Sequence, residues 1–360
     1  MSNRGAIGFG GFLLGLGVGY LLFRELTLTL SNAAWVLIIL GMAIILSAVV
    51  RAVSPGLGLH RIVGGLAGGL IFALFLTQGI NFFTGVIGVN NGFLPYSTTD
   101  VKTYTGASTL DSVYLRLGTM NGEITLSTWD KQEYSITSTI TARGSTQKEA
   151  DDNLANLGKD LTKVETSSLQ SLTLVYNSLI LINNPYQISV EVKLPATAKL
   201  DLDLTTSNGI VTVSNVNGGS VTIHTSNGAL RLTNVKADTF RGTTSNGPIT
   251  GAIEAATCDL STSNGPLTLQ IPSTRSGIYT LQTNNGNAEV TVGAAAEYRL
   301  DATTSNGDVT FSVPNITYSR DTKTSKAGQT VGYDSAQTKI FVNIQTSNGN
   351  VTVRRNISGV

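Results

Sequence analysis

The chain has 360 residues, of which 41% are hydrophobic and 13% are charged, so it is long enough for two domains and poorer in charge than an average soluble protein. A formal net charge of +1 excludes the strongly basic surface that nucleic-acid binding requires. The single cysteine excludes an intramolecular disulfide, so the fold must be stabilised by packing and hydrogen bonding.

The first 99 residues hold few charges and contain three apolar runs, at about 5–23, 32–50 and 62–83. Each run is close to the roughly 20 residues that an α-helix needs to cross a bilayer. The pattern predicts a membrane domain over residues 1–86 with three transmembrane helices. A signal peptide is the alternative for the first run, although no small-x-small cleavage site precedes Arg24 and two further runs follow.

Basic residues at the ends of these runs predict their orientation. A cytoplasmic N-terminus places Arg4, Arg51 and Arg61 inside the cell and the loop at Arg24 and Glu25 outside, as the positive-inside rule requires. The expected location is therefore the cell membrane, multi-pass, with an extracellular C-terminal domain. Glycines at four-residue spacing predict close helix packing, within the chain or by self-association. These glycines are Gly11, Gly15, Gly19, Gly64, Gly65, Gly68 and Gly69.

After the third run, the chain changes in character. Residues 87–99 are uncharged and rich in Gly, Asn and Ser, which predicts a linker that extends to about residue 104. Further on, charged helix-forming residues with Leu154, Leu157 and Leu161 at helical spacing predict a short amphipathic helix at about 146–161. We expect this helix to pack on strands and to cap one end of the domain that contains it.

A Thr-x-Asn-Gly motif recurs from residue 119 to residue 349. The glycines from 209 to 307 are spaced 19, 19, 18, 21 and 21 residues apart, and the final step of 42 is twice 21, which indicates repeats of 19–21 residues. Asn and Gly tolerate the backbone conformations of tight turns, so each motif predicts a corner between two strands. The predicted corner residues are Asn121, Gly122, Asn208, Gly209, Asn227, Gly228, Asn246, Gly247, Asn264, Gly265, Asn285, Gly286, Asn306, Gly307, Asn348 and Gly349.

Apolar residues recur at fixed distances from each corner glycine. The positions two and four after it and five and seven before it are nearly all apolar, as in Val211, Val213, Leu204 and Leu202. Because strand residues alternate between faces, these positions point into one core. Stacked copies about 4.8 Å apart bury a core that a single copy cannot. We therefore expect an all-β solenoid (β-helix) over residues 105–355. An antiparallel meander or sandwich is the alternative, because Asn-Gly is also a hairpin signal.

These repeats resemble a known family. N-terminal apolar runs, a short helix, a strand that ends in Leu194 and Pro195, and the stretch 202–209 with its serial copies are similar to the putative-adhesin family of β-strand-repeat proteins in prokaryotic cell envelopes. The resemblance covers about residues 105–355. It implies a β-solenoid on the cell surface and no established activity.

No constellation of residues predicts catalysis or cofactor binding. His60 and His224 stand apart, Cys258 falls on an inward position, and the sequence has no phosphate loop, nucleotide fingerprint or nucleophile elbow. Asp259 and Asp301 are expected two rungs apart, roughly 9.6 Å, which is too far to share a metal ion with ligands at about 2.4 Å. We expect no enzyme activity, no cofactor and no metal site.

Three other features bear on recognition. The Asn and Thr rows of the corners predict rung-to-rung hydrogen bonds, and a carbohydrate-binding row of amides and hydroxyls is the alternative. Residues 314–337 break the repeat and predict a loop excursion, which is the best candidate for partner contact on a rigid scaffold; a tolerated insertion without a role in recognition is the alternative. Sequons at Asn315, Asn350 and Asn356 are compatible with glycosylation.

Together these features predict a membrane-anchored extracellular β-solenoid that acts as an adhesin-like structural or interaction module. The expected partners are the membrane and cell-surface glycans or envelope proteins, with no nucleic acid. An envelope-stress sensing or signalling accessory protein is the alternative, and a polysaccharide-active enzyme is a third.

Overall fold

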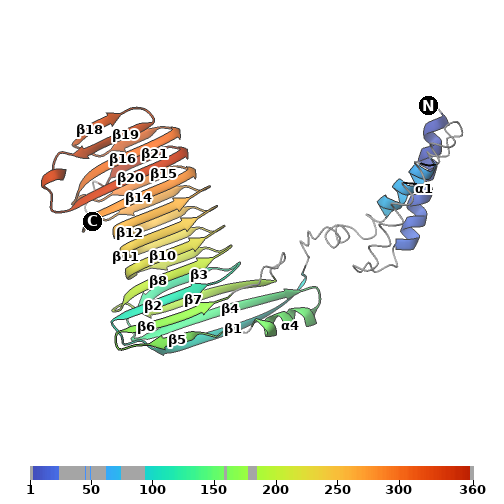
Figure 1. Ribbon diagram of the computed structural model, residues 1–360, viewed down its shortest axis with the longest axis horizontal. Helices are drawn as coiled ribbons and strands as arrows, with labels where there is room; N and C mark the ends of the chain where they lie inside the picture. The colour runs from blue at the N-terminus through green and yellow to red at the C-terminus, as the bar shows by residue number, and fades with distance from the viewer. Residues whose placement is uncertain are drawn as a thin grey trace. The chain divides into compact units, whose positions relative to one another are not determined.

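The computed structural model describes residues 3–23, 45, 49, 62–73, 94–157, 160–176 and 185–356. The described chain divides into an N-terminal helical unit, which extends to Leu94, and a β unit, which begins at Pro95 (Figure 1).

Two helices of the N-terminal unit pack closely through glycine. Helix α1 (Asn3–Phe23) lies against the helical stretch 62–73, and a Cβ placed on Gly15 would lie 2.2 Å from the carbonyl oxygen of Leu66. A Cβ on Gly69 would lie 2.1 Å from the carbonyl oxygen of Phe12. The glycine spacing therefore packs these helices within the chain, because no other residue lets the two backbones approach so closely.

The prediction of three transmembrane helices is wrong. Among the helices that the structure describes, none combines the length and the apolar character that a bilayer crossing demands. Seven of the 21 residues of α1 are glycine, which adds little apolar surface, and the described helix in the third run, 62–73, has 12 residues. The run at 32–50 lies outside the described residues except for Ile45 and Val49. The predicted multi-pass location in the cell membrane, with the β unit outside the cell, depended on these helices and is therefore wrong as well.

The β unit is a stack of rungs, each with one strand on each of two faces. On the first face the strands follow one another in space as β6 (Leu169–Val175), β2 (Ser112–Gly118), β8 (Lys199–Thr206), β10 (Asn217–Thr225), the second parts of β11 (Leu230–Thr244) and β12 (Ile249–Thr262), β14 (Gly277–Asn285), β20 (Lys339–Asn348) and β16 (Glu297–Asn306).

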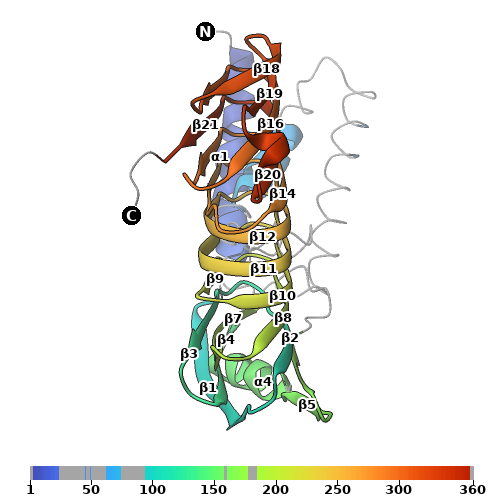
Figure 2. The same cartoon turned by 90° about the vertical axis from the view of Figure 1, so that its left-hand side faces the viewer.

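The second face has the same order of rungs. Its strands are β7 (Tyr186–Pro195), β3 (Ile124–Trp129), β9 (Val211–Ser214), the first parts of β11 and β12, β13 (Leu267–Ile271), β15 (Ala288–Val292), β21 (Val351–Arg355) and β17 (Val309–Ser312). Strands within both faces pair in parallel with their equivalents in the next rung, as Thr225 does with Thr206 and Thr244. This is the pairing of a solenoid and not of a meander; Figure 2 shows the stacked rungs β10, β11 and β12.

Antiparallel strands close both ends of the stack. At the N-terminal end, β5 (Thr162–Glu165) pairs with β6, β4 (Glu133–Gly144) pairs with β7, and β1 (Tyr96–Ala107) pairs with β4. Helix α4 (Gln147–Asn156) packs on β1 and β4, within the range 146–161 expected for a helix. Strand β1 begins inside the stretch predicted as a linker at 87–104, because that stretch finds a partner strand in β4.

At the C-terminal end, residues 314–337 form a hairpin where a loop excursion was expected. Its strands are β18 (Ile316–Asp321) and β19 (Ser325–Thr330), followed by the 3₁₀ turn η1 (Tyr333–Ser335). Strand β19 pairs antiparallel with β16 and so covers the edge of the last rung on the first face.

The order of rungs in space departs from the order in the chain at both ends. The rung β2–β3 lies between β6–β7 and β8–β9, and the rung β20–β21 lies between β14–β15 and β16–β17. The long step from Gly307 to Gly349 therefore does not lead to a rung beyond Gly307. It leads back into a gap that the earlier rungs leave open.

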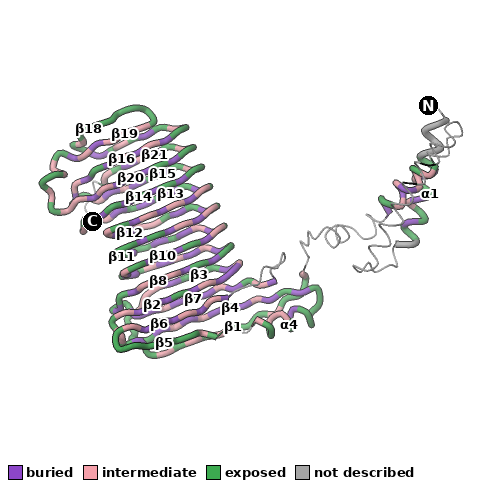
Figure 3. Tube along the Cα trace, in the orientation of Figure 1, coloured by how far each residue is buried: buried purple, intermediate pink, exposed green. Residues whose placement is uncertain are grey.

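The inward positions form one continuous core. Val211, Val213, Leu202 and Leu204 are at most 2% exposed, and equivalent residues of the other rungs join the same cluster. Figure 3 shows buried and exposed residues alternating along the strands. Burial of each such side chain stabilises the fold by about 1.5–3 kcal/mol, which is how a stack of short rungs overcomes its ordering entropy.

The corners stack into a column, and the Thr and the Asn of the repeated motif each form hydrogen bonds between neighbouring rungs. The corner Thr residues from Thr206 onward donate their hydroxyls to the carbonyl of the corner glycine in the preceding rung of the stack, as Thr225 does to Gly209 at 3.1 Å. Thr119 donates to the carbonyl of Ile188 instead. The corner Asn residues from Asn208 onward donate Nδ2–H to the Asn oxygen of that rung, at 2.5–2.8 Å, whereas Asn121 donates to the carbonyl of Tyr186. The amide ladder runs through Asn121, Asn208, Asn227, Asn246, Asn264, Asn285, Asn348 and Asn306.

The corner glycines are required by this stacking more than by turn conformation. Among the corner Asn and Gly residues, Asn121 and Gly349 have a positive φ; the others do not. A Cβ on Gly228, however, would lie 1.7 Å from the carbonyl oxygen of Gly209, and the other corner glycines meet the same obstacle. The need for glycine at the corners is therefore explained by the close approach of neighbouring rungs, and not by the turn conformation that was expected from Asn-Gly.

We predict that Gly228→Ala lowers the free energy of unfolding by about 3 kcal/mol or more, because the methyl group forces two rungs apart. Thermal and denaturant melts measure the effect. Gly332→Ala is the matched control, since Gly332 has an ordinary φ of −83° and its nearest neighbours are atoms of the flexible Glu297 side chain. Equal losses in the two variants would contradict the steric account.

Candidate functional site

Two adjoining open hollows on the first face are bordered by the C-terminal hairpin and by the turn η1, and we call them the hairpin cleft. The first has a volume of about 530 Å³ and the second of about 400 Å³. Both are lined by Arg299 of β16 and Phe341 of β20, which pair in register on neighbouring strands. The residues that matter for its chemistry are Ile278, Tyr318, Arg320, Val331, Tyr333 and Lys339.

Strand alternation aims these side chains outward. Tyr298 and Leu300 on either side of Arg299 are buried in the core, as are Ile340 and Val342 on either side of Phe341. The residue between each pair must therefore face the cleft. The hairpin itself is held over the rung by the stacked rings of Phe311 and Tyr318, whose centroids are 6.2 Å apart.

The cleft combines aromatic rings with positive charge. The guanidinium of Arg299 lies 5.9 Å from the ring centroid of Phe341, and the Lys339 ammonium lies 5.9 Å from that of Tyr333. Arg320 forms an ion pair of 2.5 Å with Asp301, which is the acidic residue among those lining the cleft. Three cations against one carboxylate leave the lining with an excess of positive charge.

The sequence carries a signal for this cleft that pattern reading missed. The position eight before the corner glycine faces outward and holds small or polar residues in the rungs of Asp201, Ser220 and Thr239. In the rungs of Gly286 and Gly349, which border the cleft, it holds Ile278 and Phe341 instead, and in the rung of Gly122 it holds Tyr114. A large apolar residue at an outward position indicates a covered or binding surface, which attention to the inward positions alone does not reveal.

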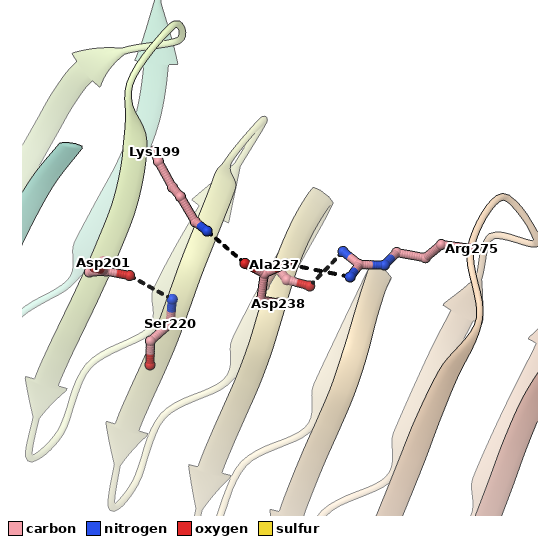
Figure 4. Close-up of polar contacts among 6 residues, drawn as sticks. All are labelled: Lys199, Asp201, Ser220, Ala237, Asp238 and Arg275. Atoms are coloured by element: carbon pink, nitrogen blue, oxygen red, sulfur yellow. Dashed lines mark hydrogen bonds and ion pairs between the residues drawn. The ribbon is translucent and has the colours of Figure 1, made fainter. Parts of the chain in front are cut away.

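A second polar cluster lies outside the cleft, on the side where the chain returns between faces (Figure 4). The Lys199 ammonium lies 2.7 Å from one oxygen of Asp238, and Arg275 lies 3.4 Å from the other and donates to the carbonyl of Ala237. The Lys199 side chain crosses the intervening rung over Gly219, where a Cβ would lie 2.8 Å from Lys199 Cε. Asp238 thereby ties together rungs that do not touch through their backbones.

The charges of this cluster form solvent-exposed ion pairs. The hydrogen bond from Lys199, together with the charges of Lys199 and Arg275, holds the pKa of the Asp238 carboxyl below its ordinary value of 3.8. The carboxylate is ionised at neutral pH and already has two cationic partners. We assign the cluster a structural role, because its polar groups bind one another.

The other residues singled out in the sequence do not assemble into a site. Cys258 is 1% exposed, and burial raises the pKa of its thiol, so it stays protonated at neutral pH and is a poor nucleophile. Asp259 and Asp301 are separated by Thr280 and Asn343, one strand more than expected. Across the described ranges, no three His, Cys, Asp or Glu residues lie close enough to hold a metal ion.

The three sequons lie on the surface of the β unit. Asn315 is exposed at a φ of 58° before β18, and Asn356 is exposed after β21. Asn350 is also exposed, but its Oδ1 accepts a hydrogen bond of 2.9 Å from the backbone N–H of Asp308. Glycosylation at these positions stays a prediction.

Comparison with known proteins identifies the repeat. Residues 187–354 match the family model described as Toastrack DUF4097, from the start of β7 to the end of β21. This part of the chain is similar to that family, and the resemblance to adhesin-like β-strand-repeat proteins is confirmed. No curated protein matches the chain.

Two solved structures are similar to this chain at low identity. A putative cell adhesion protein from Clostridium sporogenes ATCC 15579 shares 11% identity at a TM-score of 0.35, over 71% of this chain and 100% of that one. A putative adhesin from Bacteroides fragilis NCTC 9343 shares 10% identity at a TM-score of 0.31, over 71% of this chain and 97% of that one. At these scores neither carries an argument about function.

We predict that Asp238→Asn lowers the melting temperature slightly at pH 7, because it removes the shared anion from Lys199 and Arg275. Since the pKa of Asp238 is depressed in the folded state, its contribution is present above pH 3.8 and is lost as the pH falls through the depressed pKa. The difference between the two proteins should therefore vanish in acid. Asp130→Asn, at an exposed carboxylate without an ion pair in the described structure, is the control; a difference independent of pH would contradict the assignment.

Proposed function

We propose that the β unit is a rigid adhesin-like interaction module that holds its partner in the hairpin cleft and works by binding, without turnover. The Toastrack DUF4097 match supports the class of module. The fully paired strands and the continuous core support rigidity, since such a stack has few ways to deform. A rigid scaffold with an overhanging hairpin presents its recognition surface in one fixed arrangement.

The proposal rests on the positions of the large apolar side chains that are exposed to solvent. In the described β unit they gather at two places, the N-terminal strands and the hairpin cleft. Tyr96, Val101 and Val164 are at the first, and Ile278, Tyr318 and Val331 are at the second. The second group lines two hollows of about 530 and 400 Å³, so it offers a partner both apolar surface and a concave shape.

Partners of the expected classes, cell-surface glycans or envelope proteins, are compatible with this surface. The cleft contains aromatic rings, hydroxyl groups and cations, which bind sugars and protein surfaces alike. The exposed fractions of 52% for Ile278 and 76% for Val331 leave both side chains free to be covered by a partner.

The test is a glycan, cell-wall polymer and envelope-protein binding array with the full chain. We predict saturable binding that Ile278→Thr together with Val331→Thr weakens at least about tenfold, as expected for the loss of two central apolar contacts. Val101→Thr together with Val164→Thr is the matched control, because these residues are equally exposed, at 57% and 56%, but lie at the opposite end of the stack. Binding to nothing, or equal loss in both variants, would overturn the proposal.

A further inference from the structure

Within the cleft, Arg299 is a cation without an anionic partner. In the described structure its guanidinium makes no ion pair and no hydrogen bond; its contact is with the ring of Phe341. Neighbouring cations of the hairpin differ, because Lys323 pairs with Asp308, Lys326 with Asp321 and Arg320 with Asp301. Arg299 therefore retains its hydrogen-bonding capacity for a ligand.

The chemistry of Arg299 selects the ligand group. The Arg299 guanidinium is 5.9 Å from the centroid of the Phe341 ring, and its N–H groups make no hydrogen bond in the described structure. Their planar fork matches the two oxygens of a carboxylate. Lys339 adds a second positive charge to the second hollow, whose lining includes no acidic residue. Its ammonium donates to the backbone carbonyl of Asp334 at 2.8 Å, and its partner on the neighbouring strand is Glu297. An anionic ligand is attracted to both.

The shape of the site favours a sugar polymer over a peptide. Strands β14, β20 and β16 are hydrogen-bonded on both sides, so the floor of the cleft offers no free edge for a peptide strand to join. Among the lining strands, β18 pairs with β19 alone in the described structure. The half-buried rings of Phe341 and Tyr333 instead present flat surfaces, on which the C–H faces of sugar rings stack, beside the hydroxyl groups of Ser276 and Thr317.

We propose that the hairpin cleft binds a carboxylated polysaccharide, with a uronate carboxylate on Arg299 and sugar rings on Phe341 and Tyr333. This inference rests on the proposed function, and it names the class of partner that the cleft takes. Because the cleft is open to solvent, salt screens the attraction between the carboxylate and the cations, and binding should weaken as ionic strength rises.

The test uses the full chain with polygalacturonate, alginate and hyaluronan, and with carboxyl-reduced polygalacturonate as the neutral form of the same polymer. We expect binding to a carboxylated polymer and at least tenfold weaker binding to the reduced form. Arg299→Gln should weaken the former at least tenfold, about the value of one charge-assisted hydrogen bond. Arg231→Gln, at an exposed arginine on the second face, is the matched control and should leave binding unchanged.

Several outcomes would overturn this inference. These are no binding to any of the three acidic polymers, equal binding to the reduced polymer, no effect of Arg299→Gln, or tighter binding to poly(glycerol phosphate) or poly-glutamate than to the uronates. The chain could instead bind a neutral glycan and lose that binding in the Ile278→Thr, Val331→Thr variant. This result would support the proposed function but would contradict recognition of a carboxylate. Equal melting temperatures of the two arginine variants exclude misfolding as the cause of any loss.

Discussion

Close contact between backbones at the Asn-Gly corners is the constraint on which the β unit depends. The carbonyl of one corner glycine lies where the next rung's Cβ would be, so every rung is pressed against its neighbour at this edge. The buried threonine hydroxyls satisfy these carbonyls, and the asparagine amides bond to one another beside them. This also answers the open question about the corner rows: their polar groups are occupied by the structure, so a carbohydrate row is not needed to explain them.

The order of the rungs decides where residues 314–337 lie. Because the β20–β21 rung enters between β14–β15 and β16–β17, the residues before it, 314–337, must return across the end of the solenoid. They return as the hairpin β18–β19, which covers the last rung and forms the roof of the cleft. The recognition surface that we propose is thus a consequence of the rung order, and Arg299 and Phe341 are neighbours for that reason although 42 residues separate them in the chain.

The sequence predicted the structure within each rung but not the order in which the rungs stack. Corner positions, inward residues such as Leu202 and Val211, and the short helix could be read from periodicity, because each follows from contacts between equivalent positions. The position of β20 between β14 and β16 could not, since all rungs have the same pattern and nothing in the motif distinguishes neighbours. Residues 314–337 were predicted as a candidate for partner contact, but the strand residues of the cleft were missed because only the inward positions of each rung were compared. The apolar runs were interpreted as membrane spans because glycine-rich helices that pack on each other share that pattern.

Disulfide trapping tests the rung order most directly. Asn284, Ser347 and Ser305 occupy the equivalent exposed position of adjacent corners, and Cys258 is buried and does not interfere. Neighbouring strands lie about 4.8 Å apart, which is within the range of Cα–Cα distances that a disulfide bridges. Strands two rungs apart are too far from each other for a disulfide. We predict that cysteines at 284 and 347, and at 347 and 305, cross-link under mild oxidation while cysteines at 284 and 305 do not. Rapid cross-linking of 284 with 305, with none to 347, would contradict the order described for the stack.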